Sequence, residues 1–381
     1  MVVFPMDGRV LCSVHFRGYR LLRDFRLKLA GVTLVTGENG VGKSNIYRAL
    51  ALTQRMAQGT FAAAVAEEGG LPSLLWAGDR KKNEPRRMRW ELVDTDFQFE
   101  TECGMIPSAP DDPTEFRTDP DIKLEVLRHG GTKGRVMARR NGPAIDLRSP
   151  DGKMETRPLP IHAPESMLSE VRDGIRYPAM MAAREILISW RFYHHFPTGP
   201  RSPLRQPTIG FWSPVLAEDG GNLAANLQTL IECQRSGPLD DAVEMAFPGC
   251  QWSPVDDQGR FQLRLLRPGL KRWLEAAELS DGTLRFFCLC AALLTTRPPP
   301  LMIINEPEAS LHPDLLPPLA ELVAKVSGET QVLIVTHSRE LAAAVAARCD
   351  AKVVDLISHN GETRQTGQGT SSRVWTFDGD D

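Results

Sequence analysis

Residues Gly37–Ser44 read Gly-Glu-Asn-Gly-Val-Gly-Lys-Ser and fit the phosphate-binding pattern G-x-x-x-x-G-K-[ST]. The β-branched stretch Val32–Thr36 comes directly before them and predicts a buried strand. The stretch Asn45–Leu52 follows with helical periodicity and without proline or glycine. A strand, a glycine-rich loop and a helix in this order turn backbone N–H groups toward a polyphosphate at the helix N-terminus. We therefore predict that the chain binds a nucleoside triphosphate.

Each part of this phosphate loop has an expected role. Its three glycines would permit backbone conformations and close approaches that a Cβ atom would block. Lys43 would bring a positive charge to the β- and γ-phosphates, and the Ser44 hydroxyl would coordinate Mg²⁺. The loop residues predicted to bind the nucleotide, ATP, are Gly37, Glu38, Asn39, Gly40, Val41, Gly42, Lys43, Ser44 and Asn45.

Composition places few other limits on the protein. The chain has 381 residues, 42% of them hydrophobic, so we expect one large domain or two closely joined ones. A net charge of −3 argues against a protein that saturates a nucleic-acid backbone, while a local basic face stays compatible with it. Seven cysteines without a C-x-x-C pair predict neither a disulfide framework nor a zinc site.

We expect a cytoplasmic location and no membrane association. The N-terminus lacks a basic region followed by an apolar core, which argues against a signal peptide. The longest apolar run, Phe286–Leu294, is too short to span a bilayer.

Strand-like patterns dominate the first part of the chain. Val10–Phe16 and Phe25–Leu29 predict two strands, with a polar turn at Arg17–Arg20 between them. From Met88 to Leu147 short alternating runs predict an antiparallel sheet, inserted after the phosphate-loop helix.

Helical patterns follow over Ser166–Met245, and strand, helix and strand alternate again from Pro300 onward. That alternation favours an α/β fold with a mixed central sheet, an antiparallel β insert and a helical lobe. The expected division is a discontinuous core of residues 1–65 and 260–381, a β-rich insert of 66–160 and a mainly helical insert of 161–259.

An acidic strand end is the second motif. Leu301–Ile304 is an apolar strand that runs into Asn305 and Glu306. In P-loop ATPases a neighbouring strand delivers an acid to Mg²⁺, and nearby groups orient the attacking water. Glu306 is the natural general base, and Asn305 stands where an aspartate is usual; a neutral amide can hold a Mg²⁺-bound water. The alternative is a carboxylate that merely ends a strand.

Two further motifs would bring polar groups to the same site. Leu279–Thr283 precedes an apolar helix, where Ser280 and Gly282 could form a second anion site; alone, Ser280 reads as a helix N-cap. Gln331–His337 is a strand that ends in histidine. At the carboxyl edge of a parallel sheet, His337 could reach a γ-phosphate, although such a residue is usually only a polar group at a rim.

The order of these four motifs resembles the ATP-binding-cassette (ABC) class of P-loop ATPases. It is most similar to the soluble RecF/SMC-like branch, often grouped as AAA-type predicted ATPases related to the OLD family. Asn305–Pro313, which reads Asn-Glu-Pro-Glu-Ala-Ser-Leu-His-Pro, resembles that branch's acidic strand end and the turn after it. The resemblance covers residues 10–55 and 275–340 and implies an ABC-type P-loop ATPase head.

The resemblance also implies roles for individual residues. Lys43 and Ser44 would hold the triphosphate and Mg²⁺, with Asn305 as a further metal-site residue. Glu306 would be the base and His337 the γ-phosphate sensor. The nucleotide held by a second subunit would contact Ser280 and Gly282, and Glu308–His312 would lie along that interface.

The chain departs from the family in several ways. Asn305 replaces the usual acid, and the glutamine that commonly joins the two lobes has no evident match; we expect Gln54 to be a surface residue. With 44 residues after His337 (381 minus 337), we expect no nuclease domain of the kind that some OLD relatives carry. The insert is too short for an SMC-like coiled coil.

Two clusters outside these motifs have competing interpretations. Arg80–Lys82, with Arg86, Arg87 and Arg89, could contact nucleic-acid phosphates, but a solvated loop is the favoured interpretation. Trp190–Phe196 is the densest aromatic cluster, and packing of the insert or a partner surface is favoured over a metal site at its two histidines.

These observations lead to one main hypothesis and two alternatives. The leading hypothesis is a Mg²⁺-dependent ATPase that works as a head-to-tail homodimer, which opens and closes on DNA or a protein partner. The alternative is a nucleotide-gated binding module in which the neutral Asn305 makes turnover negligible. A small-molecule kinase is disfavoured by Leu279–Thr283 and by the lack of an evident acceptor site.

Overall fold

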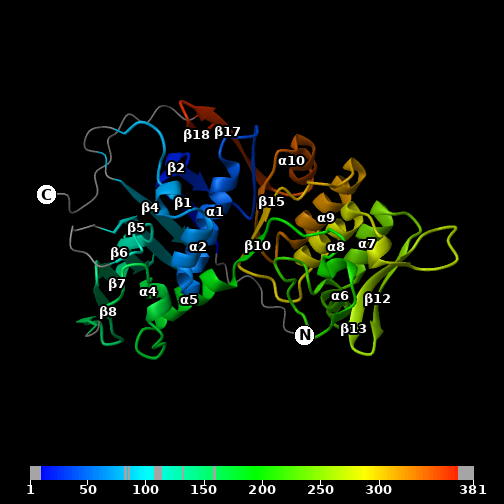
Figure 1. The fold of residues 1–381 in the computed structure, drawn as a ribbon, viewed down its shortest axis with the longest axis horizontal. Helices are drawn as coiled ribbons and strands as arrows, with labels where there is room; N and C mark the ends of the chain where they lie inside the picture. The colour runs from blue at the N-terminus through cyan, green and yellow to red at the C-terminus, as the bar shows by residue number, and fades with distance from the viewer. Residues whose placement is uncertain are drawn as a thin grey trace. The chain divides into compact units, whose positions relative to one another are not determined.

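The computed structural model describes residues 10–80, 84, 86–106, 114–130, 133–157 and 160–367. The chain forms two compact units (Figure 1). Unit 1 contains Gly31–Thr36 and Arg191–Val353, and unit 2 contains the described parts of Asp7–Ala30, Gly37–Trp190 and Val354–Asp381. Both units are therefore discontinuous in sequence. Lys81 and Lys82 of the basic cluster lie outside the described residues.

Unit 1 is built on parallel strands in the order β10-β15-β16-β3. These strands are β10 (Arg191–Tyr193), β15 (Leu301–Asn305), β16 (Gln331–Val335) and β3 (Val32–Gly37). Every residue of β15 and β16 is buried, as expected for parallel strands covered on both faces. The predicted α/β alternation after Pro300 is confirmed.

The helices of unit 1 pack around one that is apolar on all sides. From Thr283 to Leu293 every residue of α8 is buried, so this helix lies in the middle of the hydrophobic core. The helices are α6 (Leu223–Glu232), α7 (Gly237–Ala246), α8 (Asp281–Leu293), α9 (Leu316–Val326) and α10 (Arg339–Ala346). Cys288 and Cys290 fill this core.

A smaller antiparallel sheet completes unit 1. Its main hairpin joins β12 (Gln251–Asp257) to β13 (Arg260–Leu266), and β11 (Thr208–Ile209) and β14 (Leu274–Glu275) pair with β13. Single 3₁₀ turns lie at Pro203–Arg205, Ala276–Glu278 and Pro313–Leu315.

Unit 2 contains an antiparallel sheet of eight strands, in the order β2-β1-β4-β5-β6-β7-β8-β9. The strands are β1 (Leu11–Tyr19), β2 (Leu22–Lys28), β4 (Arg87–Asp94), β5 (Phe97–Met105), β6 (Pro120–His129), β7 (Arg135–Asn141), β8 (Ala144–Arg148) and β9 (Met154–Thr156). Phe16 of β1 pairs with Trp90 of β4, and both side chains are buried. The β-rich segment therefore continues the N-terminal strands in one sheet, which differs from the expected division of the chain. The reason is that β1 and β4 bury their alternate residues on the same face.

The first hairpin is longer than predicted. Arg17, Gly18 and Tyr19 belong to β1 rather than to a turn, because Arg17 pairs with Asp24 and Tyr19 with Leu22. The chain reverses at Arg20, whose φ of 46° lies in the left-handed region. The arginines and the glycine in this stretch resembled a loop in sequence, although Gly18 and Tyr19 are buried in the strand.

Helices cover one face of this sheet (Figure 1). They are α1 (Lys43–Gln58), α2 (Phe61–Glu67), α3 (Leu71–Leu74), α4 (Met167–Glu170) and α5 (Pro178–Ser189). The indole N–H of Trp90 donates to Thr53 Oγ1 of α1 over 3.0 Å. The C-terminal hairpin of β17 (Ala351–His359) and β18 (Glu362–Gln365) also contributes to this unit. Within the described ranges no helix has the length and apolar character needed to cross a bilayer.

Candidate nucleotide site

The phosphate loop lies in unit 2 and requires glycine at two points. Gly37 has a φ of 146°, and a Cβ atom there would lie 2.6 Å from the carbonyl oxygen of Leu356. Gly42 has a φ of 95° and caps α1, and its Cβ would lie 2.2 Å from Thr363 Oγ1. The loop therefore keeps a shape that side chains would prevent, with its backbone close to the β17–β18 hairpin.

Lys43 begins α1 and lies over this loop. Its side chain is buried, and Nζ donates to the carbonyl oxygens of Gly37 (2.8 Å) and Glu38 (2.7 Å). Ser44 is the next residue of the helix and is half-buried. A cation, a helix N-terminus and a curled backbone together favour an anion.

Thr363 of β18, near the C-terminal end of the described residues, forms a hydrogen bond to the phosphate loop. Its hydroxyl donates to the carbonyl oxygen of Val41 over 2.7 Å, and its N–H donates to Leu21 O over 2.9 Å. No local pattern signals this contact, because 322 residues separate the two partners.

In unit 1 the acidic strand end and the histidine strand meet at one edge. Asn305 of β15 pairs with Val335 of β16, and the N–H of Glu306 donates to Val335 O over 2.7 Å. The N–H of Thr336 donates to Val35 O of β3 over 2.9 Å. Parallel strands place their carboxyl ends on the same edge, where α/β folds bind ligands.

Asn305 is buried and pairs with a histidine from the neighbouring strand. Its Nδ2 lies 2.7 Å from Nδ1 of His194, the residue that follows β10. Its Oδ1 is also buried and has no hydrogen-bond partner among the described residues. A buried amide oxygen without a partner is costly, which makes it a suitable acceptor for a metal-bound water.

Contacts of its backbone fix the position of Glu306. It has a φ of 51°, and its carbonyl oxygen accepts from Arg285 Nη2 over 3.0 Å. The same Arg285 nitrogen lies 3.3 Å from the carbonyl oxygen of His194. Arg285 belongs to α8, so the helix that begins at Ser280 also fixes the main chain at the predicted base.

The N-terminus of α8 is tightly fitted. Ser280 Oγ accepts from the N–H of Thr283 over 3.2 Å, which confirms the N-cap interpretation. A Cβ atom at Gly282 would lie 2.7 Å from the carbonyl oxygen of Ser310. Ser310 has a φ of 64°, so the turn after Glu306 approaches α8 with its backbone.

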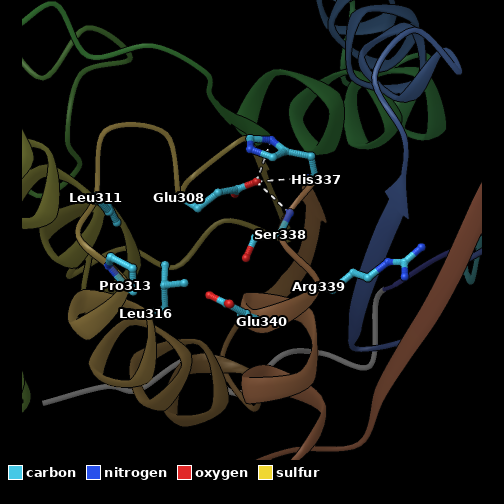
Figure 2. A pocket seen from close by; sticks show the side chains of 8 residues that line it. All are labelled: Glu308, Leu311, Pro313, Leu316, His337, Ser338, Arg339 and Glu340. Atoms are coloured by element: carbon cyan, nitrogen blue, oxygen red, sulfur yellow. Dashed lines mark hydrogen bonds and ion pairs between the residues drawn. The ribbon is translucent and has the colours of Figure 1, made fainter.

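His337 stands beside a pocket of about 440 Å³ at the end of β16 (Figure 2). Its side chain is 47% exposed, and its Nδ1 lies 3.0 Å from Oε1 of Glu308. The pocket is lined by Glu308, Leu311, Pro313, Leu316, His337, Ser338, Arg339 and Glu340.

Comparisons with known proteins agree with this geometry. Residues 189–343 match the family model described as AAA domain, putative AbiEii toxin, Type IV TA system. The thiamine import ATP-binding protein ThiQ of Photobacterium profundum is 31% identical over 105 residues, which are 26% of this chain and 40% of ThiQ. This chain therefore spans less than half of the length of that curated relative.

Solved structures show the fold over nearly the whole chain. An Smc head bound to the C-winged helix domain of ScpA has a TM-score of 0.53 at 16% identity, covering 94% of this chain and 97% of that one. An Smc head domain with an extended coiled coil, bound to the C-terminal domain of ScpA derived from Pyrococcus furiosus, has a TM-score of 0.51 at 13% identity, covering 94% and 96%. The chain has the ABC-type P-loop ATPase fold of SMC heads. The predicted fold class, an ABC-type P-loop ATPase head with a mixed central sheet, is confirmed by these structures.

The residues predicted for the nucleotide site divide between the two units. Ser280, Gly282, Asn305, Glu306 and His337 all belong to unit 1. There α8 and the turns after β15 and β16 join them through Arg285, Ser310 and Glu308. The loop residues 37–45 belong to unit 2. The sequence analysis did not identify the role of His194 or the contacts of Glu308. In the sequence, each is only a polar residue near the end of a strand.

The expectation for Gln54 was wrong. Its side chain is 4% exposed, and Nε2 donates to the carbonyl oxygens of Ile188 (3.0 Å) and Trp190 (2.7 Å). Gln54 therefore satisfies backbone carbonyls at the C-terminus of α5. The position of Gln54 in the sequence, close to Lys43, does not indicate that α5 packs beside Gln54.

The other clusters are mainly internal contacts. Arg87 pairs with Glu102 over 2.8 Å, and Arg89 pairs with Glu100. Arg80 donates to the carbonyl oxygen of Trp76 over 2.6 Å. The aromatic residues of the 190–196 cluster are buried, which confirms the packing interpretation: Trp190, Phe192, Tyr193 and Phe196.

Proposed function

We propose that this protein binds and hydrolyses ATP with Mg²⁺, between the heads of a head-to-tail homodimer that opens and closes with turnover. The phosphate loop carries the proposal. Its backbone leaves no room for a Cβ atom at Gly37 or Gly42, and Lys43 lies over it. The cradle and its cation fit a triphosphate, and the unpartnered Oδ1 of Asn305 fits a metal-bound water.

The remaining roles follow from chemistry at the edge of the sheet. Residues 37–45 would hold the phosphates, with Ser44 and Asn305 at the metal. Mg²⁺ neutralises charge that develops on the transferred phosphoryl group. Glu306 would accept the proton of the attacking water, and His337 would contact the γ-phosphate. From the partner subunit, Ser280 and Gly282 would complete the nucleotide site.

The same fold supports a proposal for partners. Smc heads bind domains of ScpA in the two solved structures described above. By analogy, we propose that opening and closing act on DNA or a partner protein in the cytoplasm. Analogy of fold alone does not select between them.

The test measures phosphate release and oligomeric state on the same samples. Wild type should release phosphate steadily with ATP and Mg²⁺, and both Lys43→Ala and Glu306→Gln should abolish release. Light scattering should show that Glu306→Gln becomes a dimer with ATP, because nucleotide binds without being consumed. A Glu306→Gln protein that stays monomeric in saturating ATP and Mg²⁺ would contradict the dimer.

The neutral amide of Asn305 favours the alternative, a nucleotide-gated module with negligible turnover. It places no formal negative charge where P-loop ATPases usually have one. Tight ATP binding without phosphate release in wild type, with dimer formation intact, would select this alternative.

A further inference from the structure

Glu308 makes a dense set of contacts to the loop that carries His337. The side chain is 6% exposed, and Oε1 accepts from Thr336 Oγ1 (2.6 Å), His337 N (2.9 Å) and Ser338 N (3.2 Å). The same oxygen lies 3.0 Å from Nδ1 of His337. Figure 2 shows the carboxylate directed at the imidazole and at the backbone of Ser338.

We propose that Glu308 is a positioning residue that fixes the orientation and tautomer of His337. This inference rests on the proposed function only for the role of His337 at the γ-phosphate. An ionised carboxylate has acceptors alone, so the ring nitrogen that faces it must carry a proton. Nε2 is then the nitrogen presented to the nucleotide, whether the ring is neutral or charged.

The backbone contacts explain how a carboxylate is tolerated there. Thr336, His337 and Ser338 form the turn into α10, and Ser338 caps that helix by accepting from Leu341 N over 3.1 Å. Glu308 thus places a negative charge at a helix N-terminus, where backbone N–H groups and the helix dipole stabilise it. Thr336 Oγ1 also accepts from Ser338 N over 2.9 Å, so the carboxylate of Glu308 and the Thr336 hydroxyl hold this loop together.

Backbone hydrogen bonds also fix the turn that carries Glu308. The turn after Glu306 closes through Ala309 N to Glu306 O (3.1 Å) and Leu311 N to Glu308 O (3.0 Å). The carbonyl of Ser310 in this turn packs on Gly282 at the start of α8. A shift of α8 or of the turn must therefore move the acceptor of His337.

The first test reads the tautomer by nitrogen NMR of ¹⁵N-histidine protein, with His337→Asn to assign the signal. Wild type should show a protonated Nδ1 at His337, and Glu308→Ala should lose that signature. Glu321→Ala, an exposed glutamate of α9, serves as the matched control and should change nothing. A protonated Nδ1 that survives in Glu308→Ala would overturn the proposal.

The second test separates kcat from KM. For Glu308→Ala we expect kcat to fall about 10- to 100-fold, as when the partner that orients a ligating histidine is lost, with KM for ATP within about twofold. Glu308→Gln keeps an acceptor oxygen and should recover part of kcat. If the alanine variant does not fold, Glu308→Leu removes the acceptor while it fills the space, and a kcat equal to that of Glu321→Ala would overturn the proposal. If the wild-type protein does not hydrolyse ATP, the proposed function is contradicted. The NMR result would still decide whether Glu308 orients His337.

Discussion

Nδ2 of Asn305 lies 2.7 Å from Nδ1 of His194, so the position that normally carries a metal-site acid holds an amide paired with an imidazole. Parallel pairing produces this contact, because Tyr193 is in register with Ile304 and the next residues meet beyond it. The arrangement removes a negative charge from the proposed Mg²⁺ site and leaves one amide oxygen for it.

Asn305→Asp should therefore strengthen the response to Mg²⁺. A carboxylate at this buried position adds a charged oxygen ligand, which divalent cations prefer. We expect the Mg²⁺ concentration for half-maximal ATP binding to fall about tenfold, which corresponds to roughly 1.4 kcal/mol. Fluorescent-nucleotide titration at graded Mg²⁺ measures this, and an unchanged midpoint would show that residue 305 does not face the metal.

Gly42→Ala should damage the phosphate loop more than Gly40→Ala does. Both residues have left-handed φ, so alanine costs about 1–2 kcal/mol at either one. At Gly42 the new Cβ also meets Thr363 Oγ1 at 2.2 Å, whereas at Gly40 nothing lies within 4 Å. Denaturant unfolding and nucleotide binding should both rank the two variants in that order. Adding Thr363→Ala should recover part of the stability lost in Gly42→Ala. Equal losses of stability in the two glycine variants would contradict the close contact between Thr363 and the loop.

Arg140→Met should destabilise unit 2 by about 3–5 kcal/mol, because it leaves Glu125 buried without its ionic partner. Both side chains are at most 1% exposed, and they lie 3.4 Å apart. Burial raises the pKa of Glu125, so the carboxyl can be neutralised by a proton when the arginine is gone. A raised carboxyl pKa gives stability at low pH that is lost as pH rises. The deficit should therefore be smaller at pH 5 than at pH 8 in urea unfolding.

Arg176→Met is the matched control for that experiment. Arg176 pairs with Glu155 over 2.5 Å, but its side chain is 56% exposed. Solvent screens an exposed ion pair, so this variant should stay close to wild type in stability at both pH values. A similar loss in both variants would show that burial does not govern these pairs.

His15 should make unit 2 less stable as pH falls. Burial lowers the pKa of His15 despite its 2.5 Å contact with Asp24, and Arg17 and Arg26 act in the same direction as burial. The unfolded histidine titrates near 6.5, so below that pH the unfolded state binds more protons than the folded one. The free energy of unfolding of wild type should therefore drop more between pH 7.5 and 5 than that of His15→Gln. Parallel pH curves would contradict this assignment.

The sequence predicted those features that depend on neighbours in the chain. The strand, loop and helix around Gly37–Ser44 follow from glycine spacing and short-range periodicity, and so does the cap at Ser280. The apolar runs at β15 and β16 by themselves indicated buried parallel strands. The limits of β1 were missed, because the sequence Arg17–Arg20 contains two arginines and a glycine and so resembles a turn.

What the tertiary structure alone decided are contacts between residues far apart in sequence. His194 reaches Asn305 across 111 positions, and Thr363 reaches Val41 across 322. Gln54 proved to be a buried cap of another helix, and Glu308 an acceptor for the loop at His337. Local patterns record which residues can form a strand, a turn or a cap, since these depend on nearby backbone and side chains. Which side chain completes another's hydrogen bonds depends on how the elements pack, and packing is set by the whole chain at once.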